Sequence, residues 1–171
     1  MTARLEVVVA RIETLALDAI VNAANTRLIG GAGVDGAIRR AAGPALNALL
    51  AQYGGLGEGQ ALLTPGFDLP ARFIIHTVAP IYAAPGPRAE KLARLGSCYR
   101  ECLLAADRAG LAEIAFPALG AGAYGWPKPL ARDIAIETVV EQLPLAPTIA
   151  RVVFCCFIEE DARLYRDALG A

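Results

Sequence analysis

Short runs rich in β-branched and other apolar residues recur along the chain, and helix-like segments separate most of them. This alternation is the strongest constraint on the fold, because strands that alternate with helices build layered α/β domains. The apolar runs predict six buried strands. Their ranges are Arg4–Ala10, Asp18–Ala23, Gln60–Thr64, Arg72–Val78, Ala112–Phe116 and Arg151–Phe157.

Apolar residues at helical spacing predict four helices between these strands. Their approximate ranges are 34–53, interrupted by Gly43-Pro44, then 88–109, 128–142 and 160–169. The link between Thr64 and Arg72 is too short for a helical crossover, so the strands that it joins should be antiparallel. We therefore expect an α/β fold, a three-layer α/β/α sandwich with a mixed sheet. No long linker divides the chain, and we expect one domain over residues 1–171.

Composition excludes several classes of protein. The chain of 171 residues is 56% hydrophobic and 19% charged, which rules out intrinsic disorder. Uncharged stretches such as Phe73–Pro87 and Ile114–Pro127, about fifteen residues with Pro or Gly inside them, are too short for a membrane span. The first residues lack the basic head and apolar run of a secretory signal, so a cytoplasmic protein is expected. A formal net charge of -1 argues against a long nucleic-acid partner.

The cysteines and the only histidine are expected to be core residues. Cys155 and Cys156 adjoin inside an apolar run, while Cys98 and Cys102 lie on or beside the apolar stripe of a predicted helix. His76 lies in an apolar strand, where a hydrogen-bonded core imidazole is commoner than a catalytic one. The spacing of these residues does not match a metal site. We expect reduced thiols and no metal.

Two glycine-rich segments each follow a predicted strand and precede a predicted helix, namely Asn25–Gly36 and Pro117–Pro127. Such loops present free backbone N–H groups, and their glycines let a ligand approach closely, which suits a phosphate. Two of them at neighbouring strand ends could hold a diphosphate. The alternative is that the glycines serve only tight turns. Gly31–Gly36 also fits the dinucleotide pattern of oxidoreductases, but the required strand and acidic residue are missing from its context.

Asp35 is the leading candidate for chemistry, because it places a carboxylate in the first turn of a helix that would face phosphates. Its simplest role is to complement the positive helix N-terminus. A second role is to hold a ribose hydroxyl or to activate a water. Asn22, at the end of a buried strand, suits a structural hydrogen bond. Asn25 lies beyond that strand and is expected to face the ligand.

Seven motifs are distributed along nearly the whole chain: Asp18–Asn25, Gly30–Ile38, Arg40–Gly43, Ile75–Val78, Phe116–Ala118, Gly122–Gly125 and Glu159–Tyr165. Together they resemble the macrodomain family, and most closely its MacroD-like class. Members of that class bind ADP-ribose and remove it from acidic protein side chains, or deacetylate O-acetyl-ADP-ribose. The resemblance implies the macrodomain fold and a hydrolase that needs no metal.

The resemblance also implies roles for particular residues. Asp35 and Asn25 are the implied catalytic pair, acting on the attacking water and the distal ribose, which Tyr124 would orient. The backbone N–H of Ile12 would meet the adenine, and the ring of Phe157 would stack on it. The implied substrate-binding residues are Ile12, Asn22, Gly31, Gly33, Val34, Gly120, Ala121, Gly122, Ala123, Tyr124 and Phe157.

Three positions depart from the family pattern. Arg11 stands where the family usually has an aspartate that accepts from the adenine amino group, and a guanidinium cannot accept. We therefore expect weak discrimination between bases. Arg39, one turn after Asp35, replaces a usual histidine. Gly120-Ala121 replaces a usual Ser-Thr, which leaves phosphate contacts to the backbone alone and should lower affinity modestly.

The sequence thus favours an ADP-ribosyl-acceptor ester hydrolase without a cofactor. Its expected partners are ADP-ribose or O-acetyl-ADP-ribose and mono-ADP-ribosylated proteins, with no membrane and no long nucleic acid. We expect a monomer. The main alternative is a non-catalytic reader of ADP-ribose, which needs the same loops but neither Asp35 nor Asn25. A third is a phosphatase acting on an ADP-ribose phosphate.

Overall fold

The computed structural model describes residues 2–171 and confirms the six predicted strands, which form one sheet. Each strand begins and ends within one residue of its predicted range, because β-branched residues favour an extended, buried backbone. The strands are β1 (Arg4–Val9), β2 (Ala19–Ala23), β3 (Ala61–Pro65), β4 (Phe73–Thr77), β5 (Glu113–Phe116) and β6 (Arg151–Cys156).

The predicted helices also form, with one difference. They are α1 (Gly33–Ala42), α2 (Pro44–Leu50), α3 (Arg88–Arg108), α4 (Lys128–Gln142) and α5 (Glu159–Leu169), with 3-10 turns η1 (Ile12–Thr14) and η2 (Leu143–Leu145). The interruption predicted at Gly43 is real: its φ of 88° is left-handed, and Pro44 then begins α2. Helix α2, which is the second half of the helix predicted over residues 34–53, is shorter than predicted, because residues 51–53 form a turn before Gly54.

The sheet is mixed, as the sequence predicts. Its strand order is β1-β6-β5-β2-β4-β3, and only β3 runs antiparallel to its neighbour, β4. The other neighbouring pairs are parallel, so their strands end at the same edge of the sheet. The short link after β3 explains the antiparallel pair, because a parallel return would need a longer crossover.

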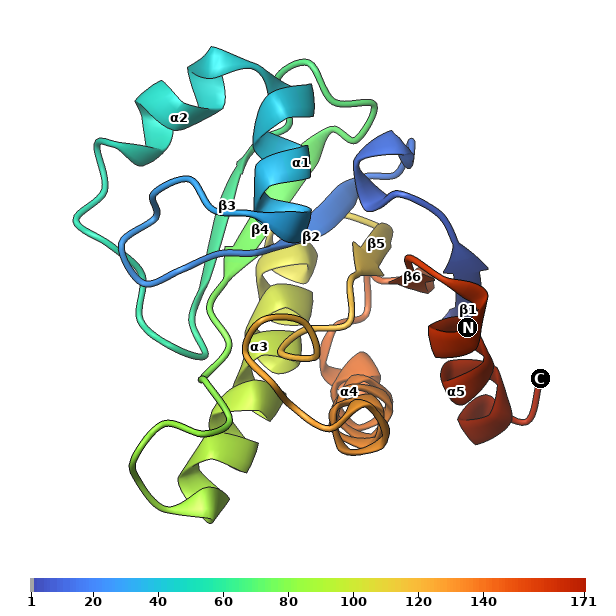
Figure 1. Ribbon diagram of the computed structural model, residues 1–171. Coiled ribbons are helices and arrows are strands. Elements are labelled where there is room, and N and C mark those ends of the chain that lie inside the picture. Colours follow the sequence, from blue (N-terminus) through green and yellow to red (C-terminus); the bar gives the residue numbers. More distant parts are fainter. Residues whose placement is uncertain (1) are drawn as a thin grey trace.

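Helices cover both faces of the sheet, which confirms the three layers (Figure 1). Alternate residues of β2 show how the faces divide: Ile20 packs in the cluster with α1 and α2, whereas Val21 packs with α3, α4 and α5. Asn22 follows Ile20 at a spacing of two and therefore faces the α1 and α2 layer. This alternation of side chains decides which helices can contact Asn22 at the end of β2.

The topology brings the two glycine-rich loops together. Strands β2 and β5 are parallel neighbours, with Ala19 paired to Ile114. The chain leaves β2 towards α1 on one face of the sheet, and it leaves β5 towards α4 on the other. Ligands of open α/β sheets bind where successive connections diverge in this way, beyond the carboxyl ends of the strands. The candidate site therefore lies at the ends of β2 and β5.

The cysteines are buried and unpaired, as expected from the sequence. Burial raises the pKa of Cys98 and of Cys155 to about 11, so both thiols stay protonated at neutral pH and are poor nucleophiles. Within residues 2–171, no helix combines the length and the apolar character that a membrane crossing requires.

Candidate functional site

The carboxylate of Asp35 is the centre of a buried polar cluster at the start of α1. The side chain is only 5% exposed and accepts hydrogen bonds from three directions. Asn22 Nδ2 donates to Oδ1 at 2.8 Å, and the backbone N–H of Gly31 donates to Oδ2 at 2.7 Å. The Nε of Arg39 lies 3.1 and 3.0 Å from the two oxygens. The position of this carboxylate is therefore determined by β2, by the first glycine-rich loop and by its own helix.

Arg39, one of the residues that depart from the family pattern, is buried beside Asp35 and forms hydrogen bonds with all three of its nitrogens. Besides the ion pair, Nη1 donates to Asn47 Oδ1 at 2.7 Å and Nη2 donates to the carbonyl of Leu28 at 3.0 Å. The guanidinium thus joins α1 to α2 and to the first loop. Because both partners are buried and hydrogen-bonded, removing either one would leave an uncompensated charge inside the protein.

Asn22 and His76 continue the polar cluster across the sheet. Asn22 Nδ2 lies 3.1 Å from His76 Nδ1, and His76 Nε2 lies 2.9 Å from Thr64 Oγ1. The expectation that His76 is a core residue is confirmed, since its side chain is fully buried. Burial and the nearby Arg39 lower the pKa of His76 to about 4, against the opposing effect of Asp35. The link from His76 to Asp35 has no signal in the sequence, because it depends on the pairing of β2 with β4.

Asn25 holds the first loop in shape. Its Nδ2 donates to the carbonyl of Ile29 at 2.7 Å, and its Oδ1 accepts from the N–H of the same residue at 3.1 Å. At Gly31, a Cβ would lie 3.4 Å from Asp35 Oδ2 and 3.9 Å from Asn25 Nδ2. Gly31 therefore lies between the two predicted catalytic side chains, which the loop brings close together.

The start of α1 offers unused backbone donors. No side chain caps this helix at Ala32, and a Cβ at Gly33 would have no atom within 4 Å. The first N–H groups of a helix have no partner inside it, and they carry the positive end of its dipole. Val34 is half-buried on the core side of the same turn. Gly33 and Val34 therefore lie at the uncapped start of α1.

A tryptophan packs against the second glycine-rich loop, Pro117–Pro127. Gly120 has a φ of 80°, and a Cβ there would lie 2.6 Å from Trp126 Cδ1. The indole is buried and donates to the carbonyl of Pro80 at 2.8 Å. The carbonyl of Tyr124 accepts from the N–H of Tyr82 at 2.9 Å, so a neighbouring loop supports this one. Sequence reasoning had no signal for the supporting role of Trp126.

The remaining residues of the second loop differ in exposure. Ala121 and Tyr124 pack in part against the core cluster of α3, α4 and α5, while Gly122 and Ala123 are exposed. Within residues 2–171, no hydrogen bond joins the Asp35 carboxylate to Tyr124. The backbone of this loop therefore forms a separate wall of the candidate site.

The two segments that are predicted to bind the adenine base lie at the other edge of the candidate site. Ile12 is buried in η1, which packs against α1, whereas the ring of Phe157 is 71% exposed just after β6. The N–H of Ala10 donates to the carbonyl of Cys156 at 3.0 Å, which brings the two segments side by side. Arg11 Nε donates to Glu13 Oε1 at 2.9 Å. Glu13 therefore supplies a carboxylate near Arg11, the position at which the family usually has an aspartate.

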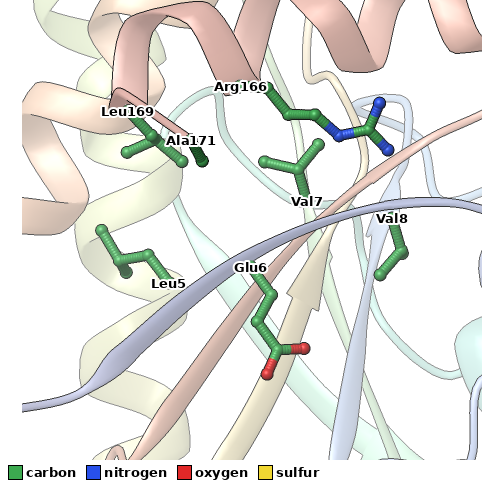
Figure 2. Close-up of a pocket in the computed structure, with 7 residues that line it drawn as sticks. All are labelled: Leu5, Glu6, Val7, Val8, Arg166, Leu169 and Ala171. Atoms are coloured by element: carbon green, nitrogen blue, oxygen red, sulfur yellow. The ribbon is translucent and has the colours of Figure 1, made fainter.

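The pocket in Figure 2 is elsewhere on the molecule. It has a volume of about 570 Å³ and lies between β1 and the end of α5. Its lining residues are Leu5, Glu6, Val7, Val8, Arg166, Leu169 and Ala171, and the predicted site contributes none of them. In the part of the chain from residue 2 onwards, no group of three His, Cys, Asp or Glu side chains is placed to hold a metal ion.

These features define a class of protein: a three-layer α/β domain with two glycine-rich loops at the junction where its strand connections diverge. More specifically, the chain belongs to the macro domain family, since the Macro domain model matches residues 21–135. It is 49% identical over 169 residues to a macro domain-containing protein of Ralstonia nicotianae, covering 99% of this chain and 96% of that one.

Two further relatives bear on function. An O-acetyl-ADP-ribose deacetylase of Salmonella newport is 44% identical over 169 residues, covering 96% of this chain and 93% of that protein. A mutant of the Oceanobacillus iheyensis macrodomain solved with ADP-ribose has a TM-score of 0.92 and 38% identity, and the match covers 97% of this chain and 91% of that one.

Proposed function

We propose that this protein is an ADP-ribose-binding hydrolase that cleaves an acyl ester on the distal ribose. Its substrates are O-acetyl-ADP-ribose and proteins that carry mono-ADP-ribose on an Asp or Glu side chain, which share that ester. The observation that carries the proposal is the buried carboxylate of Asp35, held beside Asn25 at the mouth of a glycine-rich loop. The deacetylase named among the relatives and the ADP-ribose-bound structure support it.

The two loops supply the diphosphate site in this proposal. The uncapped N-terminus of α1 offers the N–H groups of Gly33 and Val34, and the backbone of residues 120–123 forms the facing wall. A carboxylate in the first turn would repel a diphosphate, but the guanidinium of Arg39 lies against Asp35 and compensates its charge. The anion therefore meets a helix N-terminus with little net negative charge.

Asp35 keeps one acceptor position for a water. A carboxylate has about four lone-pair positions, and three hydrogens reach this one, from Asn22, from Gly31 and from Arg39 Nε, which lies against both oxygens. If the Arg39 hydrogen is bound by one oxygen alone, one position is left. A water that donates to the fourth position would be held next to Asn25, whose amide has one further N–H for a ribose hydroxyl. Tyr124 would pack against that sugar. Binding both groups in one place supplies the orientation that hydrolysis needs.

The chemical step then needs no redox change. The oxygen of the held water adds to the acyl carbon, and Asp35 orients the water or accepts its proton. The bond between the acyl carbon and the ribose oxygen breaks, and the ribose oxygen takes a proton. The products are free ADP-ribose and either acetate or the regenerated Asp or Glu side chain. The base end would be bound by the Ile12 backbone and the Phe157 ring.

The test measures release of ADP-ribose from O-acetyl-ADP-ribose and, separately, from a glutamate-ADP-ribosylated peptide. Asp35→Ala alone would leave the Arg39 cation unpaired, so the informative variant is the double change Asp35→Ala with Arg39→Met. We expect it to bind ADP-ribose and to lose turnover by about a hundredfold or more, as removal of a water-positioning group does. Asp167→Ala, which removes an exposed carboxylate at the end of α5, is the matched control.

Three results separate the alternatives. Turnover by the wild type that the double variant lacks supports the hydrolase. Calorimetric binding of ADP-ribose without any release would make the protein a reader. Release of inorganic phosphate from an ADP-ribose phosphate, with no ester cleavage, would support the phosphatase instead.

A further inference from the structure

We propose that His76, together with Thr64, is a positioning residue for hydrolysis, which acts through Asn22 to hold the Asp35 carboxylate in place. This inference rests on the proposed function for its kinetic half, but its structural half stands on the geometry of the buried cluster alone. Within residues 2–171, His76 has hydrogen bonds to Asn22 and Thr64 but none to Asp35. Its effect would be exerted by fixing which way the amide of Asn22 points.

The orientation of the Asn22 amide follows from its contact with Asp35. A carboxylate can only accept hydrogen bonds, so the Asn22 atom 2.8 Å from Asp35 Oδ1 must be the amide nitrogen. The opposite orientation would place two oxygens against each other. The observed orientation is unfavourable for the amide oxygen, because Asn22 Oδ1 is buried and has no hydrogen-bond partner within residues 2–171. Some other contact must stabilise it.

His76 supplies that contact and is restricted to one tautomer by it. The Asn22 nitrogen has two hydrogens; one goes to Asp35, and the other points to His76 Nδ1 at 3.1 Å. Nδ1 must then be an acceptor, so the ring proton is on Nε2, which donates to Thr64 Oγ1 at 2.9 Å. The hydroxyl of Thr64 in turn donates to the carbonyl of Pro65. Every link has one allowed direction.

The sheet makes this arrangement rigid. Asn22 and His76 are direct partners in the β2 and β4 register, and Thr64 lies on β3, the next strand. All three side chains are at most 1% exposed, so water does not compete for their hydrogen bonds. The charged groups that face His76 are Asp35 and Arg39, both on α1. The low pKa of His76, about 4, is consistent with a neutral ring at neutral pH.

Loss of the His76 acceptor should therefore affect catalysis more than binding. Without it, the Asn22 amide can rotate to satisfy its buried carbonyl, and its oxygen would then face Asp35. The carboxylate would lose one of its three donors and shift away from the water. Within residues 2–171, the hydrogen bonds of His76 go to Asn22 and Thr64 and not to the glycine-rich loops, so the affinity for ADP-ribose should change little.

A nuclear magnetic resonance measurement tests the structural half. The chain has one histidine, so in tag-free, 15N-labelled protein the two ring nitrogens can be observed without assignment by mutation. We expect the neutral form with the proton on Nε2 from pH 5 to 8, and a change in the Asn22 side-chain amide signals in a Thr64→Val variant. A proton on Nδ1, or a charged ring at pH 7, would overturn the proposal whether or not the protein is a hydrolase.

Kinetics with O-acetyl-ADP-ribose tests the other half. His76→Leu removes the acceptor, whereas His76→Asn retains an oxygen near the position of Nδ1. We expect kcat to fall about tenfold in the first variant with KM within about twofold, and the Asn variant to recover at least half of the loss on a logarithmic scale. Thr64→Val, which preserves shape, should give a smaller fall in kcat and serves if His76→Leu does not fold.

The outcomes are distinguishable from a failure of the proposed function. Wild-type kcat in a folded His76→Leu or Thr64→Val variant would overturn the positioning role. Equal losses in the Leu and Asn variants, with KM raised in both, would reduce His76 to a core residue and also overturn it. If the wild type itself releases no ADP-ribose, the hydrolase proposal fails, and the ring-nitrogen measurement alone decides the orientation of Asn22.

Discussion

At the scale of single residues, the ion pair between Asp35 and Arg39 determines which substitutions of either residue the fold tolerates. Both side chains are at most 8% exposed, and each has further hydrogen bonds within the protein. In such a pair the attraction mainly offsets the loss of hydration, so the pair stabilises little, but either charge alone is strongly unfavourable. Kinetic effects of single substitutions here must therefore be separated from effects on folding.

We predict that Arg39→Met lowers the free energy of unfolding by about 3 kcal/mol or more, since it leaves the Asp35 carboxylate buried without its cation. The double variant Asp35→Ala with Arg39→Met should lose less than the sum of the two single changes, because neither charge is then left alone. Urea unfolding of the wild type and the three variants measures the coupling. Additive losses would show that the two side chains do not compensate each other.

The depressed pKa of His76 predicts a dependence of stability on pH. The unfolded chain takes up a proton near pH 6.5, while the folded protein resists it until about pH 4. Stability from this group is thus complete above about pH 6.5, and about 3 kcal/mol is lost as the pH falls to 4. Urea unfolding at several pH values measures this loss.

His76→Asn is the control, since it cannot titrate in this range. Carboxyl groups such as Glu6 and Asp18, whose pKa values are lowered by hydrogen bonds and ion pairs, weaken both proteins alike in acid and cancel in the comparison. If the wild type and the variant lose stability in parallel between pH 6.5 and 4, His76 is not held neutral by the fold.

At the scale of elements, the helices and strands follow closely from local pattern, while the loop supports do not. β-branched runs and the Gly43-Pro44 break are local signals, and they locate the elements to within a residue or a few. The support of Gly120 by Trp126 depends on the hydrogen bond of the indole to Pro80, a contact between distant segments that no local pattern reveals. Residues that shape the site through other residues were therefore the ones missed.

Gly120→Ala should disturb the second loop, because the left-handed backbone and the Trp126 ring both oppose a Cβ there. We expect a loss of at least about 2 kcal/mol in unfolding free energy, with weaker binding of ADP-ribose. The fluorescence of Trp126, the only tryptophan in the chain, reports the change. Gly122→Ala is a matched control for stability, since a Cβ there meets nothing within 4 Å. Equal destabilisation by both changes would contradict this account.

At the scale of the whole molecule, the sheet order assembles the site from distant parts of the chain. Pairing of β1 with β6 brings η1 beside Phe157, and pairing of β2 with β5 brings the two glycine-rich loops together. These contacts join segments that are roughly a hundred residues or more apart. Local propensity carries no information on such pairs, because the order of strands is decided by how the helices pack on the two faces.

Base selectivity depends on two segments, around Ile12 and Phe157, that meet only in the folded molecule. Glu13 offers a carboxylate at the base end, but Arg11 holds it in an ion pair, so its acceptor is not free for the adenine amino group. We expect ADP-ribose and its hypoxanthine analogue to bind within about tenfold of each other by calorimetry. Arg11→Ala should release Glu13 and increase the preference for ADP-ribose. A strong preference in the wild type would contradict the role assigned to Arg11.

The sequence by itself determined the fold class, the elements, the mixed sheet, the family resemblance and the buried state of the cysteines and His76. These follow from patterns within short segments, where side-chain periodicity and backbone preference act. The spacing of Asp35 and Arg39 on one helix face also indicated that they are neighbours. Only the tertiary structure decided that Arg39 reaches Asn47 and Leu28, and that Asn22 connects Asp35 to His76. The direction of a hydrogen bond depends on which groups meet after folding, because a buried polar atom must take the partners that the packed chain brings to it.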